Sequence, residues 1–128
     1  MQSTYFGKIP GIGKLSVEQI FYYMDEPILF TTLDENKARY LCSCCKLGTE
    51  YLIAPATNKT LLDLIHNKIT IRQAFLNQNA TGITWDGEHV KILDNLPYDM
   101  YPEENAFLDM TENEAVITYA NTLAQKTE

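Results

Sequence analysis

Apolar residues in the first half of the chain occur in short runs whose length is typical of β-strands. Three such runs, 28–33, 38–46 and 49–54, are separated only by the polar residues 34–37 and by residues 47–48, which include a glycine. Because β-hairpins need only a few loop residues, this spacing predicts an antiparallel meander.

The segment 15–23, which precedes these runs, carries two competing patterns. Ser16 and Gln19 have the spacing of a helix capping box. Phe21 and Tyr23 instead follow the alternation of a strand. Since aromatic residues are enriched in strands, we predict a further strand here.

Helical periodicity begins after the meander. Residues 58–66 carry an apolar stripe at helical spacing, and Thr57 or Asn58 can cap this helix. Thr70 and Gln73 then form a capping box that predicts a second, short helix. We expect the apolar faces of both helices to cover the meander.

Turn residues mark the beginning of the chain and a late hairpin. Glycines and prolines interrupt residues 1–14, which we expect to be an irregular lead-in. Residues 82–93 contain Asp86-Gly87, a favoured two-residue turn, and so predict a short hairpin around that turn.

The last third of the chain predicts a loop followed by a helix. Two prolines make residues 95–110 a loop that mixes acidic and aromatic side chains, and Thr111 with Glu114 starts a terminal helix over 111–126. Strands first and helices later indicate one α+β domain over residues 1–128. We expect an antiparallel β-meander of about four to six strands with two or three short helices packed on it.

Charge is distributed unevenly along the chain. Residues 1–91 contain nine acidic and nine basic residues, whereas residues 92–128 contain eight acidic residues and one base, Lys126. Nucleic acids and anionic membranes attract clusters of Lys and Arg, and this chain has no such cluster. We therefore expect no direct binding to nucleic acid or membrane, and a protein partner with a basic surface fits the charge better.

The acidic-aromatic loop is the candidate for binding that partner. Its acids can be a solvated face that keeps the protein soluble, which is the commonest meaning of a charge run. The interleaved aromatic residues favour a second interpretation, in which acids steer a partner and aromatic side chains anchor it. The candidate partner-binding residues are Tyr98, Asp99, Tyr101, Glu103, Glu104, Phe107 and Asp109.

The amino-terminal residues and the cysteines indicate in which cellular compartment the protein is expected. Residues 1–10 lack the apolar core of a signal peptide, and no apolar run reaches a membrane-spanning length, so we expect a cytoplasmic protein. Thiols stay reduced in the cytoplasm, so three clustered cysteines do not indicate a disulfide framework. Cys42 and Cys44 should share one face of the middle strand, with Cys45 on the other.

Catalytic and metal chemistry find no support in the spacing of these residues. Tetrahedral zinc needs four convergent ligands, usually from turn-like pairs, and that spacing is absent. The two histidines, His66 and His89, lie near a predicted helix end and a predicted turn, where structural roles are common. The sequence predicts no catalytic residue, no metal and no cofactor, and we interpret the cysteines as buried apolar side chains.

Four segments, 13–15, 22–30, 51–55 and 69–75, together resemble an uncharacterised family of small bacterial domains of unknown function. The resemblance extends over residues 9–80. Its members are similar in an aromatic pair, an acidic turn with proline, a three-strand core and a segment ending in Arg-x-Ala-Phe. No activity is established for that family, so the resemblance implies no functional residue.

Three functional hypotheses follow. The leading one is a non-enzymatic protein-binding module, such as an inhibitor, immunity or adaptor protein of a bacterial or phage conflict system. The second is a small enzyme or ligand-binding domain, and the third is a thiol or metal sensor at the cysteines. The site of the second hypothesis would be assembled from Tyr22, Tyr23, Arg39, Arg72 and Trp85.

Overall fold

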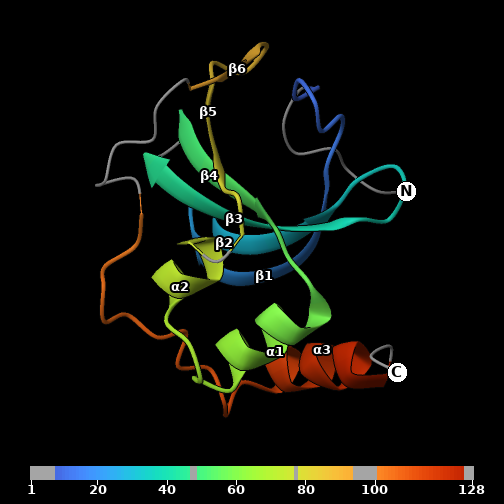
Figure 1. Ribbon diagram of the computed structural model, residues 1–128, viewed down its shortest axis with the longest axis vertical. Helices are drawn as coiled ribbons and strands as arrows, with labels where there is room; N and C mark the ends of the chain where they lie inside the picture. Colours follow the sequence, from blue (N-terminus) through green and yellow to red (C-terminus); the bar gives the residue numbers. More distant parts are fainter. Residues whose placement is uncertain (1–7, 47–48, 77, 94–100, 126–128) are drawn as a thin grey trace.

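Six strands and three helices are present in this computed structural model, which describes residues 8–46, 49–76, 78–93 and 101–125. The strands pair antiparallel in sequence order, from β1 at one edge of the sheet to β6 at the other (Figure 1). The elements are β1 Ser16–Met24, β2 Glu26–Leu33, β3 Arg39–Lys46, β4 Glu50–Pro55, α1 Asn58–Ile65, α2 Ile71–Leu76, β5 Thr81–Trp85, β6 Val90–Ile92 and α3 Glu114–Gln125. The predicted α+β meander is confirmed.

The helices lie against one face of the sheet (Figure 1). Leu41 and Leu52 of the central strands share a buried cluster there with Leu61, Leu64 and Phe75 of α1 and α2. Burying a side chain of this kind stabilises the fold by about 1.5–3 kcal/mol. The prediction that the helices cover the meander is therefore confirmed.

A second apolar cluster occupies the opposite face, where Ile9 packs with Tyr51. The Ile9 and Gly13 backbones exchange two hydrogen bonds, of 3.0 and 2.7 Å, which close a turn. Gly13 has φ 95°, a left-handed conformation that glycine adopts without strain. The described part of the predicted lead-in 1–14 is therefore an ordered turn, and residues 1–7 lie outside the described residues.

The three cysteines alternate across β3 as predicted. Cys42 is fully buried in the second cluster, and Cys44 packs against the same cluster. Cys45 packs against the cluster on the helix side. Burial raises the pKa of the Cys42 thiol to about 12, although a hydrogen bond with Thr32 opposes the shift.

Cys42 should resist thiol reagents as long as the protein is folded. The thiolate is the reactive species, and burial both raises the pKa of Cys42 and blocks access to it. Alkylation at mildly alkaline pH, followed by peptide mass spectrometry, should modify Cys44 and Cys45 first and Cys42 only after urea is added. Equal labelling of all three cysteines in the native protein would contradict this burial.

A part-buried polar network fixes α3 to the sheet. Arg39 of β3 donates two hydrogen bonds, both 2.7 Å long, to the Glu18 carboxylate of β1. Glu18 also accepts the hydroxyls of Tyr119 on α3 at 2.7 Å and Thr31 on β2 at 2.9 Å. Arg39 donates further to the side-chain oxygen of Asn58 on α1 at 2.8 Å. The network thus joins three strands to two helices.

Glu18 should make the fold less stable at acidic pH. Burial alone raises the pKa of Glu18, but hydrogen bonds from Arg39, Tyr119 and Thr31, with the Arg39 charge, outweigh it and lower the pKa from its usual 4.5. The unfolded chain therefore takes up this proton first, so the stability that Glu18 contributes is complete above pH 4.5 and is lost as pH falls through the lower, folded-state pKa.

Urea unfolding between neutral pH and about pH 3 measures this loss. The wild-type free energy of unfolding should decline more steeply below the usual Glu pKa than that of Glu18→Gln, which has no carboxylate to protonate. Parallel pH profiles of the two proteins would show that Glu18 does not carry the effect.

The capping predictions for the first two helices are confirmed. The Thr57 hydroxyl oxygen accepts the Thr60 amide at 3.1 Å at the start of α1. Thr70 and Gln73 form a reciprocal capping box at α2, in which each side chain accepts the other's amide at 2.9 and 3.1 Å. The sequence predicts the start of both helices correctly because a cap depends on residues that are only three positions apart.

The terminal helix starts later than the range 111–126 predicted. It begins at Glu114, because the Asn113 side chain accepts the Val116 amide at 3.1 Å and so acts as the cap. Asn is as strong a cap as Thr, and the sequence pattern of Thr111 with Glu114 did not distinguish the two starts. The last residue of the predicted range lies outside the described residues.

The late hairpin turns one residue beyond the predicted Asp86-Gly87 pair. Trp85 pairs with Val90, and the Asp86 amide donates to the His89 carbonyl at 3.3 Å, so residues 87–88 form the centre of the turn. The Asp86 side chain accepts the amides of Glu88 at 2.9 Å and of His89 at 2.7 Å. Asp86 therefore caps the turn instead of occupying its centre, which corrects the prediction.

Candidate protein-binding surface

Residues 101–113, here called the strap, precede α3 and form neither a helix nor a strand. The strap passes α2 on its way to α3 (Figure 1). The Ile71 amide donates to the Ala106 carbonyl at 2.9 Å, and the Arg72 guanidinium lies 5.7 Å from the centre of the Tyr101 ring. These contacts hold the first half of the strap on α2.

The second half of the strap is held on β1. Leu108 is fully buried in the helix-side cluster, and its carbonyl accepts the Tyr22 hydroxyl at 2.6 Å. Desolvation, together with the negative charge of Asp109, raises the pKa of this Tyr22 hydroxyl. The Asp109 carboxylate therefore lies close enough to act electrostatically on the edge strand.

Asn67 and Asp109 interlock beside this contact. The Asp109 amide donates to the Asn67 side-chain oxygen at 3.0 Å, and the Asn67 side-chain nitrogen lies 3.5 Å from the Asp109 carboxylate. Both residues are left-handed, with φ 60° and 57°. Asn and Asp tolerate this conformation better than other non-glycine residues. The left-handed conformation still costs energy, and residues that adopt it are enriched at functional sites.

Two small pockets flank this interlocked pair. The first, the Asp109 pocket, has a volume of about 180 Å³ and is lined by Asn67, Phe107 and Asp109. Phe107 remains 44% exposed although Leu108 beside it is fully buried. The second pocket, of about 100 Å³, lies between α1 and α3, and its lining includes Ile117, which is 39% exposed. The lining residues of this second pocket are Ile65, His66, Thr111, Ile117, Ala120 and Asn121.

The structure separates the predicted partner-binding residues into three groups. Tyr98 and Asp99 lie outside the described residues. Tyr101 is half-buried against Arg72, while Glu103 and Glu104 are exposed on the strap. Phe107 and Asp109 share one pocket. Sequence patterns did not indicate Asn67 or Ile117, because both join the surface through contacts with distant segments.

The five residues of the alternative site lie in separate surroundings. Arg39 belongs to the Glu18 network, Arg72 lies over Tyr101, and Tyr22 is bonded to the strap. Tyr23 is exposed, and its hydroxyl donates to the Asp25 carbonyl at 3.3 Å. Trp85 packs with the cluster on the opposite face, 6.4 Å from the Tyr51 ring.

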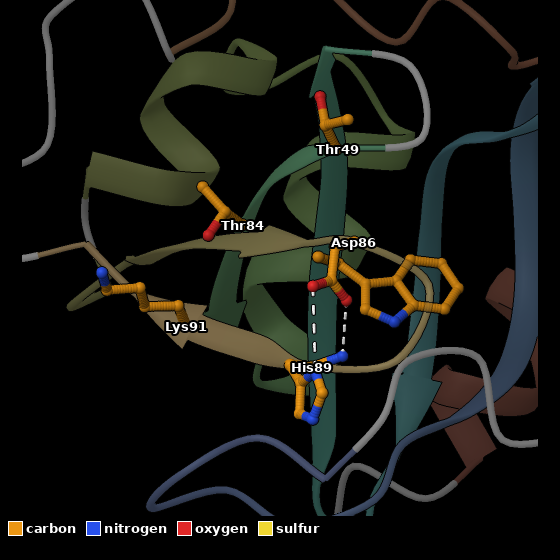
Figure 2. Close-up of a pocket in the computed structure, with 6 residues that line it drawn as sticks. Thr49, Thr84, Asp86, His89 and Lys91 are labelled. Carbon is orange, nitrogen blue, oxygen red and sulfur yellow. Dashed lines mark hydrogen bonds and ion pairs between the residues drawn. The ribbon is translucent and has the colours of Figure 1, made fainter.

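Trp85 lines a larger pocket, of about 360 Å³, at the β5–β6 hairpin. Figure 2 shows Asp86 beside His89, with Thr84 and Lys91 on one side of them and Thr49 above. The Asp86 carboxylate caps the turn and lies 3.7 Å from the His89 imidazole, so both groups already have structural partners. Lys91 and the two threonines are further polar residues of its lining.

Nowhere in the described ranges do three or more His, Cys, Asp or Glu side chains gather as a metal site requires. None of the described helices has the length and apolar character needed to cross a bilayer.

Comparisons with models of protein families, with curated proteins and with solved structures found no match to this chain. The resemblance drawn from the four sequence segments therefore stays a prediction.

Proposed function

We propose that this protein is a non-enzymatic protein-binding module that recognises a partner with a basic surface through the strap. One observation carries the proposal. Phe107 is held half-exposed between a buried leucine and the interlocked Asn67–Asp109 pair. An aromatic side chain fixed at the surface is a characteristic anchor of protein interfaces.

Preorganisation supports this interpretation. Binding costs less when the interface is already ordered in the free protein. The strap is held at Ala106 by α2, at Leu108 by Tyr22 and at Asp109 by Asn67. The segment that presents Phe107 therefore has three fixed points within four residues, and little ordering is left for the partner to induce.

The charge of the surface indicates the chemistry of the partner. Residues 101–125 contain five acidic residues and no Lys or Arg. Complementary charge steers association and excludes partners of the same sign. The five acids, all of them exposed, are Glu103, Glu104, Asp109, Glu112 and Glu114.

The module class that fits best is an inhibitor, immunity or adaptor protein of a bacterial or phage conflict system, acting in the cytoplasm. Such proteins act by occupying a surface of another protein, and a preformed contact surface lowers the cost of that binding. The strap, held by α2, β1 and Asn67, is such a surface.

Affinity capture with competition tests the proposal. The immobilised protein is incubated with extract from the source cells, and the bound proteins are challenged with excess soluble protein. Soluble wild type should displace a specific partner, whereas the soluble double variant Phe107→Ala/Asp109→Asn should not. A soluble variant with Ile92→Ala/Glu35→Gln, which removes an exposed apolar group and an acid elsewhere, serves as the matched control. Equal displacement by all three proteins would refute the strap as the contact surface.

Ligand binding at the hairpin pocket is the second candidate function, favoured by a volume within the range of small-molecule sites. Trp85 is the only tryptophan of the chain, so its fluorescence reports on this pocket without labelling. Metabolite extract that shifts this fluorescence in the wild type but not in Lys91→Ala would favour the pocket over the strap.

A further inference from the structure

The Asp109 pocket brings together a carboxylate, an exposed aromatic ring and a side-chain amide. We propose that it binds the guanidinium group of an arginine side chain of the partner. This inference rests on the proposed function, because the strap must first be the contact surface. The inference adds the chemical identity of the partner group that the pocket binds.

The shape of the pocket favours a single side chain. Its volume of about 180 Å³ is below the roughly 300 Å³ at which small-molecule sites begin. Phe107, which carries an aromatic ring, and Asp109, which carries a carboxylate, both line the pocket. A planar guanidinium can lie over an aromatic ring while donating hydrogen bonds to a carboxylate, so one group can engage both residues.

The Asp109 carboxylate retains capacity for such a partner. The carboxylate accepts one hydrogen bond in the described structure. Its donor is the Asn67 side-chain nitrogen, and the bond is long at 3.5 Å. The shorter bond between the two residues, of 3.0 Å, is donated by the Asp109 backbone amide to the Asn67 side-chain oxygen and does not involve the carboxylate. An ionised carboxylate accepts about four hydrogen bonds, which leaves room for a bidentate pair with arginine.

The same protein already uses this chemistry in its interior. The Arg39 guanidinium donates two hydrogen bonds to Glu18 and lies 5.9 Å from the centre of the Tyr119 ring. A carboxylate and an aromatic ring thus hold one guanidinium within the fold. The Asp109 pocket has the same two groups, and its described lining contains no Lys or Arg.

The end of α1 adds to the attraction for a cation. The helix ends at Ile65, and Asn67 of the pocket follows its cap residue His66. The carboxyl-terminal end of a helix carries partial negative charge, which favours cations nearby. Arginine is preferred over lysine because its planar group can stack on the ring and bond the carboxylate at the same time.

Nuclear magnetic resonance titration with capped single residues tests the inference. N-acetyl-arginine methylamide is added to the ¹⁵N-labelled protein, with the lysine and citrulline analogues as probes of charge and shape. Arginine should shift the amides of Asn67, Phe107 and Asp109 roughly fivefold more than citrulline, which is neutral but nearly isosteric, with lysine in between. Equal shifts for arginine and citrulline, or arginine shifts confined to other residues, would overturn it.

Two conservative variants distinguish the contribution of the aromatic ring from that of the carboxylate. Phe107→Leu keeps an apolar side chain without a ring, and Asp109→Asn keeps a residue that tolerates left-handed backbone without a charge. Each should reduce the arginine shifts severalfold, whereas Glu35→Gln should leave them unchanged. If soluble wild type still displaces a captured partner in a strap-dependent way while arginine causes no shifts, only the arginine assignment is wrong and the proposed function stands.

Discussion

Replacing Arg39 by alanine should lower the free energy of unfolding by about 3 kcal/mol, because the partly buried Glu18 carboxylate loses its positively charged partner. Side-chain exposure of only 13% for Arg39 and 19% for Glu18 limits the compensation that water can offer. Asn58 on α1 also loses a hydrogen bond of 2.8 Å. For a domain of this size the midpoint of thermal unfolding should fall by about 10 °C.

Two further variants make the Arg39 prediction specific. Lys59→Ala also removes a salt bridge, with Asp63, but the Lys59 side chain is 82% exposed, so the loss should stay below about 0.5 kcal/mol. The double variant Glu18→Met/Arg39→Met leaves no charge behind and should recover part of the stability. A wild-type melting temperature in Arg39→Ala would show that the network does not hold the fold together.

Replacing Phe107 by alanine should weaken binding of the captured partner at least about tenfold while leaving the fold intact. The ring is half-exposed, and the buried contact of the strap is made by its neighbour Leu108. Binding energy is therefore lost without a matching loss of packing. Calorimetric affinity and thermal unfolding, measured on the same preparation, distinguish the two effects.

Asp109→Asn and Ile92→Ala provide the comparison for Phe107→Ala. Asp109→Asn preserves the left-handed backbone and should reduce mainly the association rate and its dependence on salt, because a steering charge is lost. Ile92→Ala removes an exposed apolar side chain from β6 and should not change the affinity. A Phe107→Ala protein that binds normally, or that is unfolded, would contradict the anchor role.

Local patterns in the sequence were sufficient to predict the strands and the first two helices. The meander follows from apolar runs with short connections, and the Thr70–Gln73 box caps α2 as expected. These features depend on residues a few positions apart. Errors of one to three residues arose where two nearby residues could serve the same purpose, as with Asn113 and Thr111.

The candidate surface could be predicted only in part. The acidic-aromatic composition made Phe107 and Asp109 candidates, but nothing in the spacing indicated that Asn67, 42 residues away, would interlock with Asp109. Tyr22 reaches the strap over 86 residues. Such contacts depend on how the helices pack on the sheet, which single-sequence periodicity does not encode.

The same limit applies to the Glu18 network. Register shifts between Val17 and Gln19 interrupt the alternation of β1, and Glu18 lies within that irregularity. Its carboxylate meets the Tyr119 hydroxyl 101 residues later in the chain. A bulge adds a residue to one strand and redirects its side chains, so the face of Glu18 could not be read from alternation.

The position of the bound partner tests the central claim most directly. Amide hydrogen exchange, followed by mass spectrometry, compares the free protein with the protein saturated by its captured partner. Added protection should appear in peptides covering the strap and the end of α1 around Asn67, with none at the β5–β6 hairpin. Protection confined to the hairpin, with the strap exchanging as in the free protein, would contradict the account.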